Sequence, residues 1–205
     1  AEKLSLKLVV LTFNPHPMFV FGDRKNAALI MSPEEKCITM EKMGVDTYIE
    51  YPFDREFASM SPEDFAIKLL FERLRSKVVV VGYDYHFGSK QKGDDKLLEK
   101  LGKEYGVKTV FIPKVIYEGS RVSSTRIREC ILNRDIDCAD RLLTEPYFIV
   151  GRVEKGKRIG RTIGFPTANI DYPENVIKIP YGVYYVKVGK MRGIMNWGMK
   201  PTVHN

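Results

Sequence analysis

Short apolar segments alternate with helix-start signals through most of this chain, and this alternation restricts the fold more than any other feature. The clearest strand signal is 77–82 (Lys-Val-Val-Val-Val-Gly), and 6–13 is a second apolar, β-branched segment. Such runs are typical of strands buried on both faces. Ser-Pro-Glu occurs at 32–34 and again at 61–63, with serine as N-cap and proline at the first helical position. The pattern predicts an α/β fold with a parallel sheet and right-handed crossovers.

The remaining elements follow in chain order. Strands are expected over 6–13, 45–51, 77–82 and 107–113, and helices over 33–43, 62–74, 94–105, 123–133 and 136–143. We expect Asn-Pro-His-Pro at 14–17 to end the first strand without starting a helix, because proline restricts the backbone there. Ligands bind at the carboxyl ends of parallel strands. That rule selects 14–17, 82–88 and the approach to Ser123.

The pattern changes after Tyr147. Short strands are expected over 147–153, 182–188 and 191–196, separated by Gly, Pro and Asn turns, with no further helix signal. We therefore place a domain boundary near Glu145-Pro146 and expect two domains, 1–145 and 146–205. The second should be an antiparallel β unit, and about 60 residues is small for an independent barrel. We expect this unit to be cut short at Asn205.

Composition places the chain among globular proteins, with 44% hydrophobic and 29% charged residues. No segment approaches the roughly 18 apolar residues of a membrane span, and the N-terminus lacks the apolar core of a signal peptide. Cys37, Cys130 and Cys138 have no Cys-x-x-Cys spacing, so free thiols and a cytoplasmic location are expected. His16, His86 and His204 have no ligand-spaced partners, which argues against a zinc site.

Charge is unevenly distributed along the chain. Residues 1–145 carry 23 Lys and Arg against 23 Asp and Glu, whereas residues 146–205 carry 10 against 3. The whole net charge of +7 therefore lies in the last 60 residues. This asymmetry predicts that the second region meets an anion, either a nucleotide or a nucleic acid.

The basic excess surrounds a glycine-rich segment, 151–169. Glycine lets backbone N–H groups approach a ligand, and such groups with nearby cations bind phosphate. Thr167 and Asn169 then supply neutral oxygens of the kind that suit Mg²⁺. One interpretation is a phosphate and metal site. The other is a solvated, basic hairpin between two strands.

Two further segments carry candidate residues. Residues 82–88 (Gly-Tyr-Asp-Tyr-His-Phe-Gly) follow the strongest strand, so they bring Asp84 and aromatic faces to the sheet edge, or else pack as an aromatic loop. Residues 121–128 (Arg-Val-Ser-Ser-Thr-Arg-Ile-Arg) place hydroxyls and arginines at a helix start. They form either an anion site or an ordinary serine cap. His16, between two prolines, is either packed or ligand-facing.

Six motifs, in order, resemble the prokaryotic bifunctional riboflavin kinase/FAD synthetase family. They are Thr-Phe-Asn-Pro-His-Pro at 12–17, 82–88, 121–128, Gly-Phe-Pro-Thr-Ala-Asn at 164–169, Tyr-Gly-Val-Tyr at 181–184 and Asn-Trp-Gly-Met-Lys-Pro-Thr at 196–202. The resemblance implies a Rossmann-like nucleotidyltransferase domain with a parallel sheet, followed by part of a six-stranded antiparallel β-barrel of the riboflavin kinase type. It implies ATP-dependent phosphorylation of riboflavin to FMN, then adenylylation of FMN to FAD with release of pyrophosphate.

The resemblance also implies roles for individual residues. Asp84 would lie beside the reacting phosphates, while Arg121, Ser124 and Thr125 would hold the phosphates of ATP. Thr167 and Asn169 would bind Mg²⁺ and ATP in the kinase half. The flavin would be bordered by Phe13, Pro15, His16, Pro17 and Phe21. Further binding positions would be Asn14, Gly82, Phe87, Arg128, Gly160, Arg161, Gly164, Pro166 and Asn196.

Two elements of the family pattern do not occur in this sequence. They are the strand with a His-x-Gly-His nucleotide loop that begins the first domain, and the Glu base that follows Pro-Thr in the second. We therefore expect these residues to be part of a longer protein. Small-molecule substrates are expected as partners, with neither nucleic acid nor membrane, and a homo-oligomer is compatible with the sequence. Two alternatives stay open: a nucleotidyltransferase for another substrate, and a nucleic-acid-binding protein that uses the basic second region.

Overall fold

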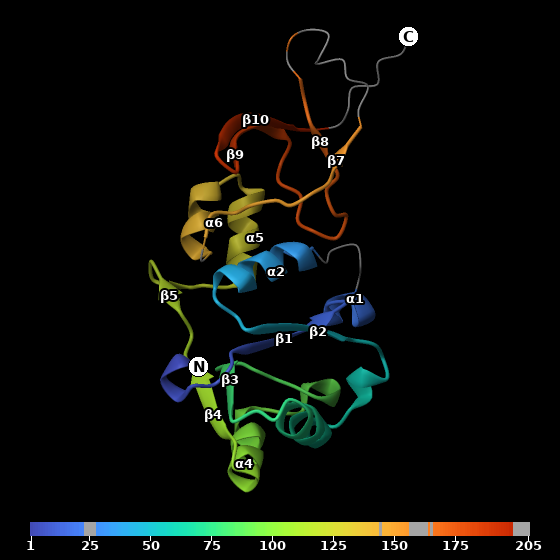
Figure 1. The fold of residues 1–205 in the computed structure, drawn as a ribbon, viewed down its shortest axis with the longest axis vertical. Helices are drawn as coiled ribbons and strands as arrows, with labels where there is room; N and C mark the ends of the chain where they lie inside the picture. Colours follow the sequence, from blue (N-terminus) through green and yellow to red (C-terminus); the bar gives the residue numbers. More distant parts are fainter. Residues whose placement is uncertain (23–27, 144, 156–163, 165, 199–205) are drawn as a thin grey trace. The chain divides into compact units, whose positions relative to one another are not determined.

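The computed structural model describes residues 1–22, 28–143, 145–155, 164 and 166–198 (Figure 1). The chain divides into two compact units, each built from two separate stretches of sequence. Unit 1 comprises Ala1–Ala27 and Met40–Arg121, and unit 2 comprises Ala28–Thr39 and Val122–Asn205. A short stretch near the N-terminus is thus part of the same unit as the C-terminal residues.

Unit 1 contains two pairs of parallel strands (Figure 1). β1 (Val9–Asn14) pairs with β2 (Thr47–Pro52), and β3 (Val78–Gly82) pairs with β4 (Lys108–Ile112). Leu11 lies opposite Ile49 in the first ladder. The parallel direction confirms the α/β prediction. Among the described residues, however, the two ladders are separate two-stranded sheets and not one continuous sheet.

Helices begin at the predicted capping signals. Before α2 (Pro33–Lys42), the Ser32 hydroxyl accepts from the Glu35 N–H, and the Glu35 carboxylate accepts from the Ser32 N–H. This reciprocal pair is the capping box that the sequence predicts. Asp94 accepts from the Leu97 N–H in the same way and starts α4 (Asp95–Tyr105).

The second Ser-Pro-Glu signal also starts a helix, but of a different kind. Ser61 accepts from the Asp64 N–H and opens α3 (Pro62–Asp64), which continues as a π-helix, η3 (Phe65–Arg73). Hydrogen bonds between residues five apart extend to its end, where the Leu74 N–H donates to the Leu69 carbonyl. The sequence pattern predicted a helix here but did not predict that it is a π-helix.

One helix lies where the sequence predicted none. α1 (Pro17–Phe21) follows β1 directly, and the Nδ1 atom of its N-cap, His16, accepts from the Met18 N–H at 3.3 Å. The prediction was wrong because proline disfavours helix interiors but suits the first helical position, where its N–H would have no partner. β1 also includes Asn14, one residue beyond the expected end.

The core of unit 1 lies among η3, α4 and the β3–β4 ladder. Ala66 and Leu98 are fully buried there, and Phe65 and Leu69 are nearly so. These side chains come from the apolar face of each helix. The core therefore fixes the start of η3 against the ends of the strands.

Short turns and a hairpin complete unit 1. The turns are 3₁₀ segments, η1 (Glu2–Leu4), η2 (Phe57–Ser59) and η4 (Ser89–Gln91). The hairpin is formed by β5 (Ile116–Tyr117) and β6 (Ser120–Arg121). None of the described helices has the combined length and apolar character that crossing a membrane requires.

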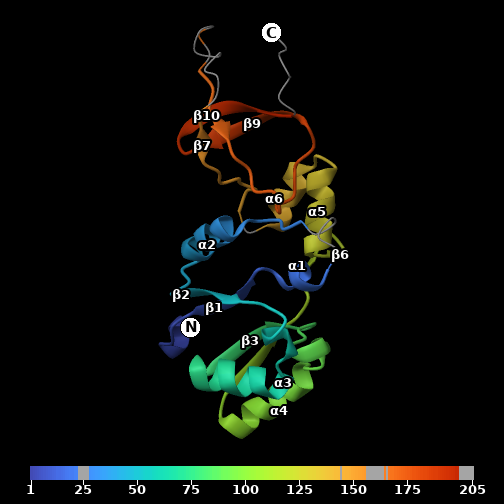
Figure 2. The same ribbon diagram turned by 90° about the vertical axis from the view of Figure 1, so that its right-hand side faces the viewer.

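Two antiparallel helices begin the second part of unit 2, α5 (Ser124–Leu132) and α6 (Ile136–Leu142), side by side in Figure 2. A disulfide joins Cys130 to Cys138 across them. The expectation of free thiols is therefore wrong for this pair, because the tight turn between the helices brings the two cysteines together. Cys37 is an exposed free cysteine.

The strands of unit 2 are antiparallel, as predicted. β7 (Val153–Glu154) pairs with β8 (Asn169–Ile170), and β9 (Gly182–Val188) pairs with β10 (Met191–Trp197). β7 is much shorter than the strand expected over 147–153. The described residues form these two ladders and no closed barrel. Leu29 adds a parallel bridge to Val176, in the segment after β8.

Candidate functional site

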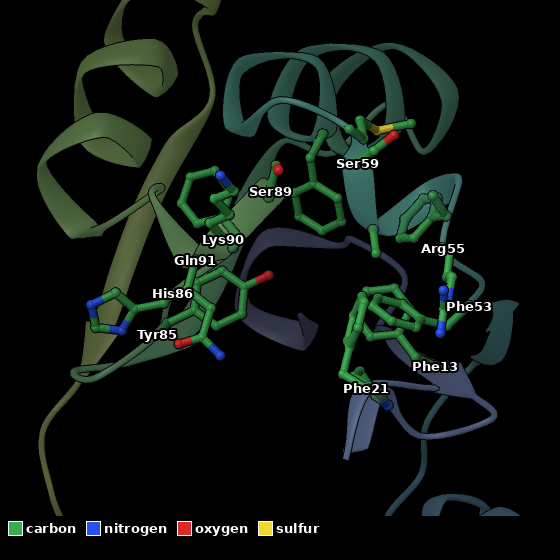
Figure 3. Close-up of a pocket in the computed structure, with 17 residues that line it drawn as sticks. Phe13, Phe21, Phe53, Arg55, Ser59, Tyr85, His86, Ser89, Lys90 and Gln91 are labelled. Atoms are coloured by element: carbon green, nitrogen blue, oxygen red, sulfur yellow. The ribbon is translucent and has the colours of Figure 1, made fainter. Parts of the chain in front are cut away.

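An apolar pocket of about 650 Å³ lies at the carboxyl ends of the strands in unit 1. It receives side chains from the end of β1, from α1, from the segment after β2, from the start of η3 and from the loop after β3 (Figure 3). The lining residues are Phe13, Pro17, Phe21, Phe53, Arg55, Phe57, Ala58, Ser59, Met60, Phe65, Tyr85, His86, Phe87, Gly88, Ser89, Lys90 and Gln91. Parallel α/β sheets bind ligands at this edge.

Aromatic rings form two groups around the pocket. In one, Phe13 lies 5.2 Å from Phe53 between ring centroids, and Phe21 meets Phe53 edge-on at 6.0 Å. In the other, Tyr85 and Phe87 stack at 5.5 Å with nearly parallel planes. Figure 3 shows Tyr85 across the open space from Phe13, Phe21 and Phe53. Phe65 connects the two groups, with its ring centroid 6.4 Å from that of Phe13 and 5.7 Å from that of Phe87. Such an aromatic lining suits a flat ligand ring.

The polar lining residues surround this apolar space. Arg55 and Lys90 are the formally charged residues of the lining, and both are exposed cations. Burial raises the pKa of the Tyr85 phenol to about 12, so it remains a neutral hydrogen-bond donor at physiological pH. The pocket can therefore hold an apolar ring and attract a negatively charged group at its rim.

Beside the pocket, Asp84 and Arg121 form an ion pair. The guanidinium Nη2 of Arg121 donates to the Asp84 carboxylate at 2.6 Å, and the same guanidinium lies 5.2 Å from the centre of the Tyr83 ring. The β5–β6 hairpin presents the arginine, and the turn after β3 presents the other two residues. Both charged side chains are half-exposed. The pair leaves an arginine accessible to phosphate close to an apolar pocket.

Only some of the residues that were expected to bind the flavin line this pocket. Phe13, Pro17, Phe21 and Phe87 line it. Asn14 and Pro15 are not among the lining residues, and the Asn14 amide donates to Glu50 instead. His16 caps α1, and Gly82 ends β3.

The residues from 121 to 128 are divided between the units. Arg121 ends unit 1, whereas Ser124, Thr125 and Arg128 belong to unit 2. Ser123 caps α5, accepting from the Arg126 N–H, and both Ser124 and Thr125 are exposed in its first turn. The Nε of Arg128 donates to the carbonyl of Ala28 at 2.9 Å. That arginine therefore joins two segments of unit 2.

Most of the residues expected to bind ligands in the kinase half lie near β7 and β8, and Asn196 lies in β10. Asn169 is half-buried in β8 opposite Glu154, and Thr167 and Pro166 are exposed just before it. Gly164 has a φ of 80°. Asn196 lies in β10 opposite Val183. Gly160 and Arg161 lie outside the described residues.

The donor set at Thr167 and Asn169 can be compared with what Mg²⁺ requires. A hydroxyl and an amide oxygen suit this hard cation, but both are neutral. Among the described residues, no cluster of three or more His, Cys, Asp or Glu side chains could hold a metal. These residues therefore fit Mg²⁺ only in company with the phosphates of a bound nucleotide, which is how proteins commonly hold this ion.

Several lining residues escaped the sequence analysis. They are Phe53, Arg55, Phe57 and Met60 from the segment after β2, and Lys90 and Gln91 from the loop after β3. The available signal was the aromatic spacing of 51–57, which follows an expected strand end directly. The carboxyl-end rule applies to that strand as much as to its neighbours.

Fold and pocket together define a class of protein, the α/β proteins with an aromatic-lined pocket at the carboxyl ends of parallel strands. Comparison with known families gives more detail. The model of the FAD synthetase family matches residues 1–126, and that of the riboflavin kinase family matches residues 143–205.

Individual proteins give the same result. The chain is 37% identical over 207 residues to the bifunctional riboflavin kinase/FMN adenylyltransferase of Escherichia coli K12, covering 98% of this chain and 66% of that protein. It is 38% identical to the Haemophilus influenzae protein of the same description, covering 100% and 68%. The Bacillus subtilis protein is 37% identical, with 100% and 66% covered. The chain thus belongs to the bifunctional riboflavin kinase/FMN adenylyltransferase family.

A solved structure shares the fold as well. A Streptococcus pneumoniae chain described as a macrolide-efflux protein superposes with a TM-score of 0.79 at 31% identity. The match covers 97% of this chain and 66% of that one. The present chain thus spans 66% of the length of most of these relatives.

Proposed function

We propose that the full-length protein makes FAD from riboflavin in two ATP-dependent steps. The first step phosphorylates riboflavin to FMN, and the second adenylylates FMN to FAD with release of pyrophosphate. The observation that carries the proposal is the aromatic pocket at the carboxyl ends of β1, β2 and β3, which fits a flat tricyclic ring. Membership of the family supports both steps.

Adenylylation belongs to the first domain, residues 1–145, a Rossmann-like nucleotidyltransferase. The isoalloxazine ring lies against Phe13 and Phe21, and Phe87 lines the buried wall of the pocket. Arg121 holds ATP phosphates, kept in place by Asp84 beneath it. Ser124 and Thr125 lie in the other compact unit, and the family resemblance alone supports them as further phosphate ligands. Adenylyl transfer needs mainly positioning and charge neutralisation, which these residues supply.

Phosphorylation belongs to the second domain, residues 146–205, the first part of a riboflavin kinase β-barrel. Thr167 and Asn169 hold Mg·ATP. When bound, Mg²⁺ neutralises charge on the transferred phosphoryl group. The half-buried position of Asn169 in a paired strand supports its role, because the ladder fixes its backbone. We place both reactions in the cytoplasm.

The direct test supplies the full-length protein with riboflavin, ATP and Mg²⁺ and follows the flavins by chromatography. FMN should form first and FAD second. A folded protein that forms neither would refute the proposal. Replacing FMN by a phosphate monoester without a flat ring tests the alternative of another adenylylation substrate, and we expect no transfer to it.

A further inference from the structure

The N-terminal stretch of unit 2, residues 28–35, is hydrogen-bonded to the segments on both sides of the β7–β8 ladder. We call this ladder, with residues 150–152 before it and 171–177 after it, the β7–β8 arm. The arm carries Asn169, a candidate nucleotide ligand. Residues 28–35 lie within the FAD synthetase match, whereas the arm lies within the riboflavin kinase match. A stretch assigned to one activity is thus bonded to a site assigned to the other.

Glu35 is hydrogen-bonded to Val150, the first residue of the arm. Its side chain is 1% exposed, and its two carboxylate oxygens accept from two backbone N–H groups. Oε2 accepts from Ser32 at 2.7 Å, and Oε1 accepts from Val150 at 2.8 Å. Hydrogen bonds of an ionised carboxylate to N–H groups are among the stronger ones, and burial strengthens them further. The capping box needs only the hydrogen bond from Ser32. The hydrogen bond from Val150 is not part of the cap and joins the helix start to the arm.

Leu29 is hydrogen-bonded to the last residues of the arm, Asn175 and Ile177. Its N–H donates to the Asn175 carbonyl at 2.9 Å, and its carbonyl accepts from the Ile177 N–H at 2.8 Å. Val176, between them, is 2% exposed. The Tyr172 hydroxyl donates to the Ile177 carbonyl at 2.6 Å and adds a third bond to this end. The arm is therefore fixed at entry and exit by one short stretch of chain.

The base of the arm transmits position from Val150 to Asn169. Gly151 packs so closely on Ile170 and the Asp171 carbonyl that a Cβ there would overlap both. The Asp171 N–H donates to the Arg152 carbonyl at 3.0 Å, and the ladder continues to the Glu154–Asn169 pair. A shift at the entry would move the base with it, because the Gly151 contact and the hydrogen bond from Asp171 to Arg152 join the two segments.

We propose that Glu35 is a positioning residue for riboflavin phosphorylation, which holds Val150 and thereby sets the β7–β8 arm and Asn169 in register for the nucleotide. The inference rests on the proposed function of the C-terminal region. It assigns Glu35 no contact with substrate. It predicts that one buried acid in the adenylyltransferase part of the sequence controls ATP binding by the kinase.

The test compares three variants of the full-length enzyme. Glu35→Gln keeps the shape of the side chain but replaces one acceptor by an amide NH₂, so one of its two bonds is lost. Glu34→Gln removes the adjacent, exposed acid of the same helical turn. Ser32→Ala removes the cap hydroxyl and leaves the Glu35 carboxylate for Val150. The last two variants are matched controls for charge and for helix capping.

Steady-state kinetics of both activities provide the first measurement. For Glu35→Gln, we expect the KM for ATP in riboflavin phosphorylation to rise about tenfold or more, as loss of one charge-assisted hydrogen bond implies. Adenylylation of supplied FMN should stay within about twofold of wild type, because the hydrogen-bond partners of the Glu35 side chain, Ser32 and Val150, do not belong to the adenylylation site. Both control variants should keep phosphorylation close to wild type.

Amide hydrogen exchange provides the second measurement, independent of activity. Val150 should be protected in the wild type and should exchange about tenfold faster or more in Glu35→Gln. An unprotected Val150 in the wild type would overturn the proposal, even if the variant folded poorly. Equal loss of both activities in Glu35→Gln would overturn the proposal. The same rise in the KM for ATP in Ser32→Ala would also overturn it, because helix capping alone would then explain the effect. If the wild type forms no FMN while the exchange result holds, the proposed function is what fails.

Discussion

Phe21 and Phe65 both line the aromatic pocket, but only Phe65 also belongs to the core. Phe65 is 3% exposed, whereas Phe21 is 64% exposed. Replacing Phe65 by alanine should lower the free energy of unfolding by about 3–5 kcal/mol, because a large cavity remains in the core. Phe21→Ala should change it by no more than about 0.5 kcal/mol. Urea denaturation of both variants measures the difference.

The same pair separates binding from stability. Phe21→Ala should raise the KM for FMN about fivefold to tenfold, which corresponds to loss of one aromatic contact with the ring. An unchanged KM for FMN in this stably folded variant would exclude Phe21 from the flavin site.

Tyr85 makes stability depend on alkaline pH. Burial raises the pKa of its phenol to about 12 in the folded protein, while the unfolded chain should titrate near pH 10. Below pH 10 both states keep the proton, so the phenol contributes no pH dependence. Between about pH 10 and 12 only the unfolded state loses its proton, and stability falls as pH rises. Tyr85→Phe should reduce this fall in unfolding free energies measured from pH 9 to 12. An unchanged slope would contradict the burial.

Arg121 should be important for activity and unimportant for stability. Its ion pair with Asp84 is half-exposed, and exposed pairs contribute about 0–1 kcal/mol. Arg121→Lys keeps the charge but loses the planar fork and the contact with Tyr83. We expect thermal stability close to wild type, and a KM for ATP in adenylylation that rises about tenfold. Riboflavin phosphorylation in the same preparation is the control, and an equal effect there would reject the assignment.

At the scale of elements, the loop after β3 positions half of the pocket. Gly88 has a φ of 69°, and a Cβ there would lie 2.5 Å from the Pro62 Cα at the start of α3. Gly88→Ala should therefore cost about 2 kcal/mol or more, from strain and overlap together. Gly119 has a similar φ of 71° but open space around it, so Gly119→Ala should cost only about 1 kcal/mol. Thermal unfolding of both variants checks the contrast, and equal effects would contradict the close packing.

Elements whose signals are local could be predicted from the sequence. Ser32, Ser61 and Asp94 mark helix starts by their own side chains, and the structure has a helix at each one. The short helix after His16 was missed because proline terminates and initiates helices with equal ease, and only the following residues decide. The Cys130–Cys138 pair depends on a turn geometry that spacing alone does not fix.

The candidate site was predictable to a similar extent. Phe13 and Phe87 lie in motifs at strand ends, and the family resemblance implied Phe21; all three line one pocket. Arg55 and Lys90 could not be derived, because their place at the rim depends on how two loops fold over the sheet edge. No periodicity specifies the path of such loops.

At the scale of the whole molecule, the family matches and the compact units follow different boundaries. The FAD synthetase match ends at residue 126, but unit 2 takes in Ala28–Thr39 from within that match. The two proposed activities therefore have separate ligand residues but share structural support. This arrangement predicts that ligand residues can be changed one activity at a time, while shared residues such as Glu35 affect the kinase from a distance.

We propose that this chain carries residues of two distinct sites, one for each step of FAD formation. The most direct measurement is to assay both steps in the full-length Thr167→Ala variant. We expect FMN formation from riboflavin to be abolished, because a phosphate and Mg²⁺ ligand is lost. FAD formation from supplied FMN should proceed at the wild-type rate. Equal loss of both steps would contradict the account.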